Sequence, residues 1–185
     1  MASRDISKLV PELREKAEQL VEKVSKSFPV LIYCTGRSAE EQAKIYRKSR
    51  TFAVIKAKHD TLVKYGHTEL AQILLDVGPQ YGELGRHLTK AGPGESWHQY
   101  WQAFDAVPMI GGKPAWIIRT HKAEWAELGR VATELGLNWG GNWPKWADYP
   151  HFQLPVTGNP LKIKSTQLGR DLKLNETLIM RESDL

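Results

Sequence analysis

The sequence predicts an α+β fold in which a small antiparallel sheet is flanked by helices. Two observations favour this class. Short apolar runs of strand length lie between longer segments whose apolar residues recur at every third or fourth position. Strands scattered among helices in this way are typical of small α+β domains. With 185 residues, we expect a single domain over 1–185, with its core in about 30–154 and a tail of unassigned role at 156–185.

The N-terminal part of the chain predicts one helix followed by one strand. Apolar residues at helical spacing indicate an amphipathic helix over residues 4–26, with Asp5 or Ser3 as its cap. Residues 29–34 form a short, β-rich apolar run, which predicts a buried strand. We expect the strand to be part of the core and the helix to cover one face of that core.

Helices are expected to follow this strand. Ser38 begins a helical segment with Glu41 three residues further on, the pattern of a capping box. Residues 53–90 are mostly helical in pattern, with one or two short helices separated by glycine and proline. This region is expected to form one wall of the site described below.

The second half of the chain predicts two further strands and one helix. Residues 103–110 read as a strand that ends in a glycine turn. Thr120 is expected to cap a helix that runs to Leu135, with Gly136 as its C-terminal stop. Residues 151–154 are the last predicted strand. The chain thus alternates helices with three short strands.

Composition and charge limit the classes of partner. The net charge of +5 and a pI of about 9.3 favour polyanions, such as nucleic acid, anionic lipid or acidic polymers of a bacterial wall. No dense lysine and arginine run of the nucleic-acid-binding type occurs. Cys34 is the only cysteine, which excludes a cysteine-rich zinc site. We interpret it as a small buried hydrophobic residue.

The sequence also bears on location. Its N-terminus has no apolar segment of the secretory type, so no signal peptide is predicted. No run of 18 apolar residues occurs, so no membrane span is predicted either. We expect synthesis in the cytoplasm and a separate route to any site of action outside it.

Two segments together offer the donors of a zinc site. The first carries His98 and Asp105, and the second carries Asp148 and His151. Two imidazoles and a carboxylate suffice as protein ligands of a hydrolytic zinc, and a spare carboxylate would take a proton from water. If the segments meet in space, they form a single zinc site in a cleft.

The spacing within each segment has its own consequence. His98 and Asp105 are seven residues apart, so they would share a face on a continuous helix, whereas an extended chain would separate them too far for one ion. Either the chain bends between them or they are not a ligand pair. Pro150 restricts the residue before it to extended conformations, which fixes how His151 enters its strand. The alternative interpretation of this second segment is a surface turn followed by an ordinary edge strand.

The motifs resemble one family of zinc peptidases, the D-alanyl-D-alanine carboxypeptidases (VanY-like) and the phage L-alanyl-D-glutamate endopeptidases. Ser96-x-His98-x6-Asp105 is similar to the first family motif, S-x-H-x-x-G-x-A-x-D. The segment 148–152 is similar to the second, D-x-P-H-F. Residues 36–46 resemble an upstream block, R-S-x-x-E-Q-x-x-L-Y. The resemblance covers about residues 30–154, in the order of the family.

The resemblance implies a role for each matching residue. The zinc ligands would be His98, Asp105 and His151. Asp148 would be the catalytic carboxylate. Arg37 would hold a substrate carboxylate or polarise the scissile carbonyl, which suits its planar set of donors.

Two further residues and one departure complete the comparison with the family pattern. Gln42 would lie near Arg37 and take part in substrate binding, and the hydroxyl of Ser96 would support the ligands. Trp101 stands where the family has glycine. If that glycine has a positive φ, Trp101 is strained. Trp139, Trp143 and Trp146 are interpreted either as an apolar wall of the site or as packing within a loop.

The resemblance implies a zinc-dependent peptidase of the peptidoglycan stem peptide, and we favour the L-alanyl-D-glutamate endopeptidase type. The alternatives are a D-alanyl-D-alanine carboxypeptidase or dipeptidase, and a non-catalytic wall-binding module. A compact, basic chain without a signal peptide is expected of a phage or prophage endolysin released by a holin. Its partners would be peptidoglycan and anionic wall polymer or lipopolysaccharide, without nucleic acid, and the protein would be a monomer.

Overall fold

The computed structural model describes residues 2–77, 87–156 and 158–163. The chain divides into two compact units. The helical unit contains Arg37–Tyr100 and the segment that starts at Gly158, and the sheet unit contains Ser3–Gly36 and Trp101–Thr157. The single domain expected from the sequence stays a prediction, and most of the tail at 156–185 lies outside the described residues.

An antiparallel sheet of short strands forms the centre of the sheet unit. The strands are β1 (Val30–Cys34), β2 (Ala103–Ile110), β3 (Lys113–Pro114), β4 (Asn138–Trp139) and β5 (His151–Gln153). Their order is β1-β2-β5-β4, with β3 beside β2, and all four pairings are antiparallel. The predicted α+β class with a small antiparallel sheet is confirmed.

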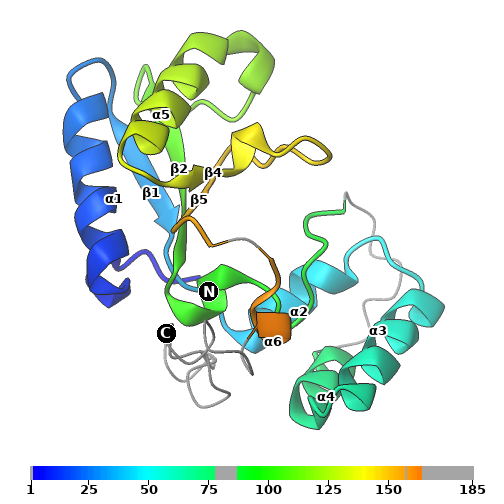
Figure 1. Ribbon diagram of the computed structural model, residues 1–185. Coiled ribbons are helices and arrows are strands. Elements are labelled where there is room, and N and C mark those ends of the chain that lie inside the picture. The colour runs from blue at the N-terminus through cyan, green and yellow to red at the C-terminus, as the bar shows by residue number, and fades with distance from the viewer. Residues whose placement is uncertain (1, 78–86, 157, 164–185) are drawn as a thin grey trace. The chain divides into compact units, whose positions relative to one another are not determined.

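Two helices pack on this sheet, α1 (Pro11–Val24) and α5 (Lys122–Glu134) (Figure 1). Their apolar faces, which include Leu13 and Leu128, are fully buried. They meet a core that contains Phe104 of β2 and Phe152 of β5, whose rings are stacked with centroids 5.3 Å apart. Burial of such aromatic side chains is a large source of folding free energy. The core therefore lies directly beside the pairing of β2 with β5.

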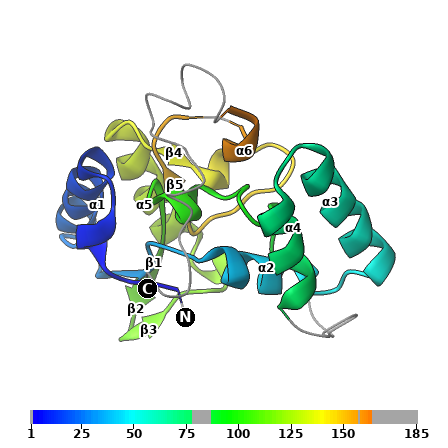
Figure 2. The same ribbon diagram turned by 90° about the horizontal axis from the view of Figure 1, so that it is seen from below.

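In its described residues, the helical unit contains the α-helices α2 (Ala39–Arg47), α3 (Phe52–Lys64), α4 (Thr68–Asp76) and the short α6 (Pro160–Ile163). Helices α3 and α4 lie side by side in both views (Figures 1 and 2). The buried guanidinium of Arg47 donates to the carbonyl oxygens of Leu74 and Leu75, which ties α2 to α4. The helical pattern predicted for 53–90 is thus confirmed as far as Asp76.

Two predicted helix starts are wrong. The first helix begins at Pro11 rather than at residue 4, because the residue before a proline avoids the helical region and proline favours the first helical position. Asp5 caps only a 3₁₀ turn, where it accepts from the backbone of Ser7. Thr120 belongs to another 3₁₀ turn, and His121 occupies the N-cap of α5.

Within the described residues, no helix has both the length and the apolar character needed to cross a membrane.

Candidate active site

The pairing of two strands brings an aspartate and a histidine together in the sheet unit. Asp105 of β2 lies directly opposite His151 of β5. The Oδ1 atom of Asp105 is 3.4 Å from Nδ1 of His151, and both residues are buried. Residues opposite each other on neighbouring strands project to the same face, so backbone pairing sets this contact. A carboxylate oxygen and an imidazole nitrogen therefore converge, as two ligands of one metal would.

The second ring nitrogen of His151 also has a partner. Its Nε2 atom is 3.0 Å from Oε1 of Gln153. Burial alone would lower the pKa of His151, but the hydrogen bond and charge of Asp105, the charge of Asp148 and the contact with Gln153 together raise it. The indole ring of Trp143 lies over the imidazole, with centroids 5.2 Å apart. The ring of His151 is thus restrained on several sides.

Asp148 lies in the turn that leads into β5. Its backbone nitrogen donates to the carbonyl oxygen of Gly140 (2.9 Å), and its own carbonyl oxygen accepts from the nitrogen of His151 (3.1 Å). Its carboxylate is close enough to His151 to raise the pKa of that imidazole. The carbonyl oxygen of Pro150 accepts from Ala106, so the turn is joined to β2 as well. Asp148 is therefore a carboxylate held near the Asp105–His151 pair.

Gly140 is a site residue that sequence reasoning missed. A Cβ atom at this position would lie 2.4 Å from the carbonyl oxygen of Asp148 and 3.2 Å from Cβ of His151. Only glycine allows the two segments to approach so closely. The Gly-Gly pair at 140–141 is visible in the sequence, but its contact with Asp148 is not.

Cys34 is buried, as predicted, but its surroundings were not foreseen. It lies opposite Asp105 on the β1–β2 pairing, just after an irregularity in the register at Ile32. Its Sγ atom is within 4.8 Å of a carboxylate oxygen of Asp105. A thiol is thus present next to a predicted zinc ligand. The irregular register has no signal in the sequence, so no reading of the chain alone would have placed it there.

Four of the predicted site residues belong to the helical unit, and two of them form a direct hydrogen bond. The guanidinium of Arg37 donates from Nη1 to Oε1 of Gln42 (3.1 Å). The amide nitrogen of Gln42, which is fully buried, donates to the carbonyl oxygen of Ala91 (2.7 Å). Ser38 caps α2 by accepting from the backbone of Glu41 (3.1 Å), as predicted, which sets where Gln42 falls on the helix. The predicted proximity of Arg37 and Gln42 is therefore observed.

His98 lies in the 3₁₀ helix Trp97–Tyr100 and is buried. Its carbonyl oxygen accepts from the backbone nitrogen of Arg37 (3.4 Å), so these two predicted site residues are neighbours within the helical unit. Ser96 precedes this turn and accepts through its carbonyl oxygen from the nitrogen of Gln99 (3.1 Å). The hydrogen bond that the structure gives Ser96 is thus made by its backbone.

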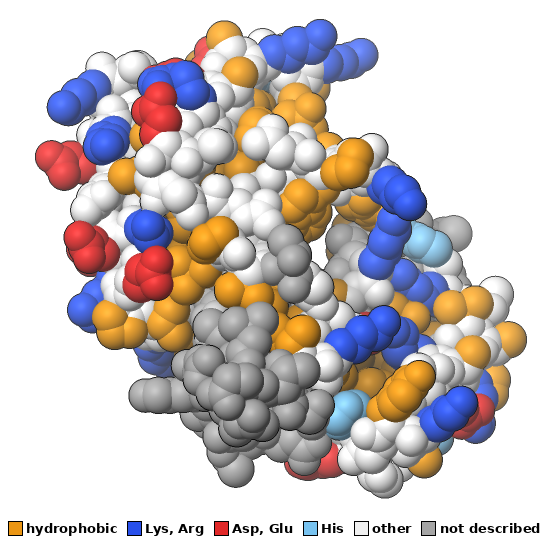
Figure 3. Space-filling view, viewed as in Figure 1, with side chains coloured by type: hydrophobic (Ala, Val, Ile, Leu, Met, Phe, Trp, Pro, Cys, Tyr) orange, Lys and Arg blue, Asp and Glu red, His pale blue; other side chains and the backbone are white. Residues whose placement is uncertain are grey.

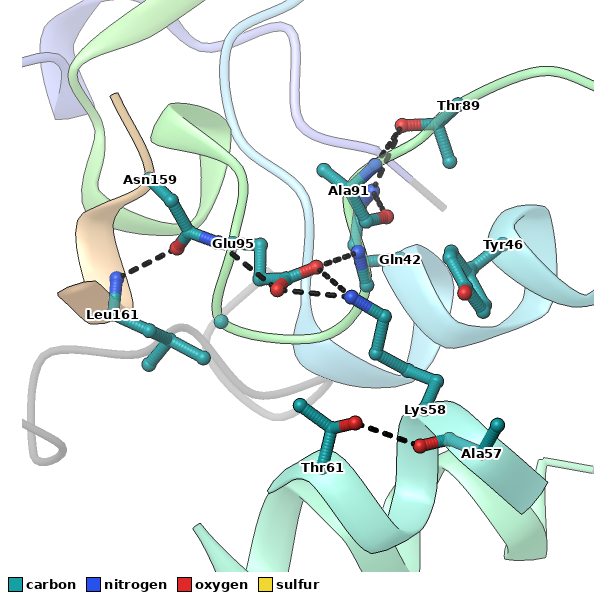
Figure 4. Close-up of polar contacts among 12 residues, drawn as sticks. Gln42, Tyr46, Ala57, Lys58, Thr61, Thr89, Ala91, Glu95, Asn159 and Leu161 are labelled. Atoms are coloured by element: carbon teal, nitrogen blue, oxygen red, sulfur yellow. Dashed lines mark hydrogen bonds and ion pairs between the residues drawn. The ribbon is translucent and has the colours of Figure 1, made fainter. Parts of the chain in front are cut away.

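A polar cluster fixes the segment just before Ser96 (Figure 4). The carboxylate of Glu95 accepts from the ammonium of Lys58 (2.8 Å), the backbone nitrogen of Gly92 (2.6 Å) and the amide of Asn159 (2.9 Å). These groups come from α3, from the loop itself and from the segment before α6. The Glu95 cluster therefore restrains the chain directly upstream of Ser96 and His98.

Trp101 has a φ of 57°, in the left-handed region, at the position where the family has glycine. The strain foreseen for this residue is thus present. Within the sheet unit its carbonyl oxygen accepts from the nitrogen of Val10 (3.1 Å), and the ammonium of Lys8 lies 5.4 Å from its ring centroid. This left-handed residue lies in the chain between His98 and Asp105.

The three tryptophans of the second segment differ from one another. Trp139 is part of the core, and its indole nitrogen donates to the carbonyl oxygen of Tyr149 (2.7 Å). Trp143 covers His151, whereas Trp146 is 39% exposed. Trp139 therefore matches the interpretation as packing within the loop. Trp143 matches the interpretation as an apolar wall beside the site.

The residues thus form two sets. In the sheet unit, Asp105, Asp148 and His151 offer a carboxylate–imidazole pair with a second carboxylate, the donor set of a metal-dependent hydrolase. In the helical unit lie the residues Arg37, Gln42, Ser96 and His98. The roles that the resemblance implies for these seven residues stay predictions.

Comparison with known proteins agrees with the class of metal-dependent hydrolases. Residues 89–154 match the model of a family described as D-alanyl-D-alanine carboxypeptidase. The matched segment contains His98, Asp105, Asp148 and His151. Over this segment the chain is similar to that peptidase family, which agrees with the resemblance recognised from the motifs and with the prediction of an enzyme.

Two individual proteins are similar over most of the chain. The peptidoglycan L-alanyl-D-glutamate endopeptidase CwlK of Bacillus subtilis (strain 168) is 27% identical over 155 residues, which cover 80% of this chain and 74% of that protein. The crystal structure of Serratia marcescens L-Ala D-Glu endopeptidase ChiX matches with a TM-score of 0.41 and 21% identity, over 83% of this chain and 88% of that one.

Proposed function

We propose that this protein is a zinc-dependent peptidase that cleaves the L-alanyl-D-glutamate bond of the peptidoglycan stem peptide. The observation that carries the proposal is the buried contact of Asp105 with His151, with Asp148 beside it, inside the segment that matches the peptidase family. The name of CwlK, a peptidoglycan L-alanyl-D-glutamate endopeptidase, supplies the substrate and the bond.

The donor atoms of the sheet unit fit a zinc ion. Carboxylate and imidazole are both ordinary zinc ligands, and the Oδ1 atom of Asp105 and the Nδ1 atom of His151 already face each other. His98, from the family motif, would be the third ligand, which leaves a coordination position for water or substrate. When bound, zinc supplies a Lewis acid that polarises a carbonyl group and makes water more acidic.

Asp148 is the proposed general base and acid. Its carboxylate would accept the proton that water loses as it attacks the scissile carbonyl, and would return that proton to the leaving amine. The backbone contacts of Asp148 with Gly140 and His151 hold it in place for this transfer. A site that bound metal only for stability would have no use for such a carboxylate.

Arg37 and Gln42 are the proposed substrate-binding residues. Arg37 donates from Nη1 to Gln42, and its planar guanidinium is a donor group suited to a carboxylate of the stem peptide. Gln42 would hold the guanidinium in the required orientation, and Ser96 would support the segment that carries His98. Part of the transition-state charge would also be stabilised by Arg37.

The surface is consistent with a wall-associated substrate. On the face that Figure 3 shows, lysine and arginine side chains predominate over the helical unit, whereas acidic and basic side chains are mixed over α1. A basic surface attracts anionic wall polymer or lipopolysaccharide. We further propose that the protein is a monomeric, bacteriolytic endolysin of phage or prophage origin, which reaches the wall after holin-type release.

A D-alanyl-D-alanine carboxypeptidase activity is the second candidate, favoured by the description of the matching family. Mass spectrometry of purified peptidoglycan digested with the wild-type protein separates the two. We expect fragments with a new N-terminal D-glutamate that are absent after chelation. Free D-alanine would identify the carboxypeptidase instead. The absence of any metal-dependent product would leave a non-catalytic wall-binding module as the better account.

A further inference from the structure

Gln153 contacts the imidazole of His151 from the far end of the same strand. Successive side chains of a strand alternate between its faces, so residues 151 and 153 of β5 project to the same side. Gln153 is only 4% exposed, and its Oε1 atom is 3.0 Å from Nε2 of His151. A buried amide of this kind is expected to have partners for each of its polar atoms.

The partners of the amide nitrogen determine the orientation of Gln153. Its Nε2 atom donates to the carbonyl oxygen of Val156, and more weakly to that of Leu154 (3.5 Å). Carbonyl oxygens only accept hydrogen bonds, so the nitrogen end of the amide must face them. The oxygen end is thereby directed at His151, where it can only accept.

The orientation of the amide in turn determines which nitrogen of His151 carries the proton. Because Oε1 of Gln153 is an acceptor, Nε2 of His151 must be the protonated nitrogen. The lone pair of a neutral imidazole then lies on Nδ1, the atom that is 3.4 Å from the carboxylate of Asp105. This is the nitrogen that faces the other proposed ligand of the sheet unit.

We propose that Gln153 is a positioning residue that holds His151 in the Nε2-protonated tautomer, so that Nδ1 binds the metal beside Asp105. This inference rests on the proposed metal site. Histidines that bind metals generally have their other N–H held by an acceptor, and loss of that acceptor typically weakens metal binding or activity by about 10–100-fold. The opposite interpretation is that Gln153 only fills space in the core.

Replacing Gln153 by methionine distinguishes these interpretations. Gln153→Met removes the acceptor at nearly constant side-chain length, and we expect zinc affinity to fall by about 10–100-fold, measured by competition with a chromogenic chelator. Phe152→Leu is the matched control, since Phe152 lies on the same strand but in the apolar core. This control should lower the melting temperature and leave zinc affinity unchanged. Unchanged affinity in Gln153→Met would overturn the inference.

A spectrum of the wild-type protein tests the same inference without any variant. In the zinc-loaded protein, long-range ¹H–¹⁵N correlations of His151 should show a protonated Nε2 and a metal-bound Nδ1. The reverse assignment would overturn the role of Gln153 while leaving zinc bound through His151. If His151→Ala bound zinc as tightly as the wild type, the proposed metal site itself would be overturned, and this inference with it.

Discussion

The two units hold their functional residues by different means. In the sheet unit, Asp105 and His151 are fixed by the backbone hydrogen bonds of β2 with β5, and Asp148 by backbone bonds in the adjoining turn. In the helical unit, Arg37 and Gln42 are held by side-chain hydrogen bonds near the start of α2. Backbone pairing allows less movement than a chain of side-chain contacts.

We propose that this difference separates two of the three zinc ligands and the general base from the residues that recognise the substrate. Metal binding and proton transfer require geometry accurate to a fraction of an ångström, which adjacent strands provide. A guanidinium that binds a peptide carboxylate tolerates more adjustment. We therefore expect changes in the sheet unit to affect metal binding and kcat, and changes at Arg37 to affect substrate recognition together with the rate.

The largest effect is expected for His151→Ala. Loss of a ligand should weaken zinc binding by more than about 100-fold, since loss of an outer hydrogen-bond partner alone costs 10–100-fold. Hydrolysis of peptidoglycan should fall at least as far. Metal content is measured by mass spectrometry of the dialysed protein, with His121→Ala at the N-cap of α5 as the control. Full metal content in His151→Ala would contradict the assignment of His151 as a metal ligand.

Asp148→Asn should separate proton transfer from metal binding. We expect kcat to fall by about 10²–10⁴-fold, the usual contribution of a general acid–base group, with zinc affinity close to that of the wild type. Steady-state hydrolysis of a soluble stem peptide provides the measurement. Asp5→Asn serves as the control, because asparagine can replace aspartate at the cap of its turn. Retention of full activity in Asp148→Asn would rule out the catalytic assignment.

Arg37→Lys tests the helical unit. Lysine keeps the charge but lacks the planar fork, so kcat/KM should fall by about 10²–10³-fold, as for loss of one donor to the transition state. Zinc content should not change. Arg130→Lys, an exposed change on α5, is the matched control. If Arg37→Lys lost zinc but kept its KM, the assignment of recognition to the helical unit would be wrong.

Gly140→Ala should move the turn that carries Asp148. The added Cβ atom meets the backbone of that turn at 2.4 Å, and a displacement of about 1 Å can cost roughly 10²-fold in rate. The activity assay used for Asp148→Asn applies here too. Gly112→Ala, in a turn with a φ of 75° and no atom within 4 Å of the added Cβ, should reduce stability alone. Equal activities for the two variants would mean that Gly140 has no part in placing Asp148.

The smallest effect concerns the strain at Trp101. The variants Trp101→Gly and Trp101→Ala both lose the ring, so they differ in the left-handed φ of 57°. Glycine adopts this conformation without the penalty of about 1–2 kcal/mol that other residues incur. The glycine variant also has the more flexible unfolded state, which reduces the difference in unfolding free energy between the two variants by about 0.4–1 kcal/mol. Chemical denaturation should show Trp101→Gly to be the more stable of the two, and the opposite order would remove the case for strain.

Sequence reasoning foresaw much of the fold because each confirmed element has a local signal. The apolar run at β1, the Ser38 cap and the Gly136 stop of α5 are all properties of neighbouring residues. The start of α1 was misplaced because apolar spacing was followed through Pro11. The residues of the proposed site were visible because the motif spacings of His98 with Asp105 and of Asp148 with His151 are local too.

The remaining features depend on pairings that local sequence does not encode. Cys34 meets Asp105 only through the register of β1 with β2, and Gly140 meets Asp148 only through the fold of the turn. The orientation of Gln153 depends on carbonyl oxygens that follow it in the chain, but its target, His151, is identified as a ligand only by the family motif. Contacts of this kind follow only from the tertiary fold.

The most direct test of the central claim is hydrolysis of purified peptidoglycan by the protein before metal removal, after dialysis against a chelator, and after zinc is added back. We predict that cleavage is lost on removal of the metal and restored by stoichiometric zinc. Cleavage that continues in the metal-free protein, or no cleavage with zinc bound, would contradict a metal-dependent peptidase.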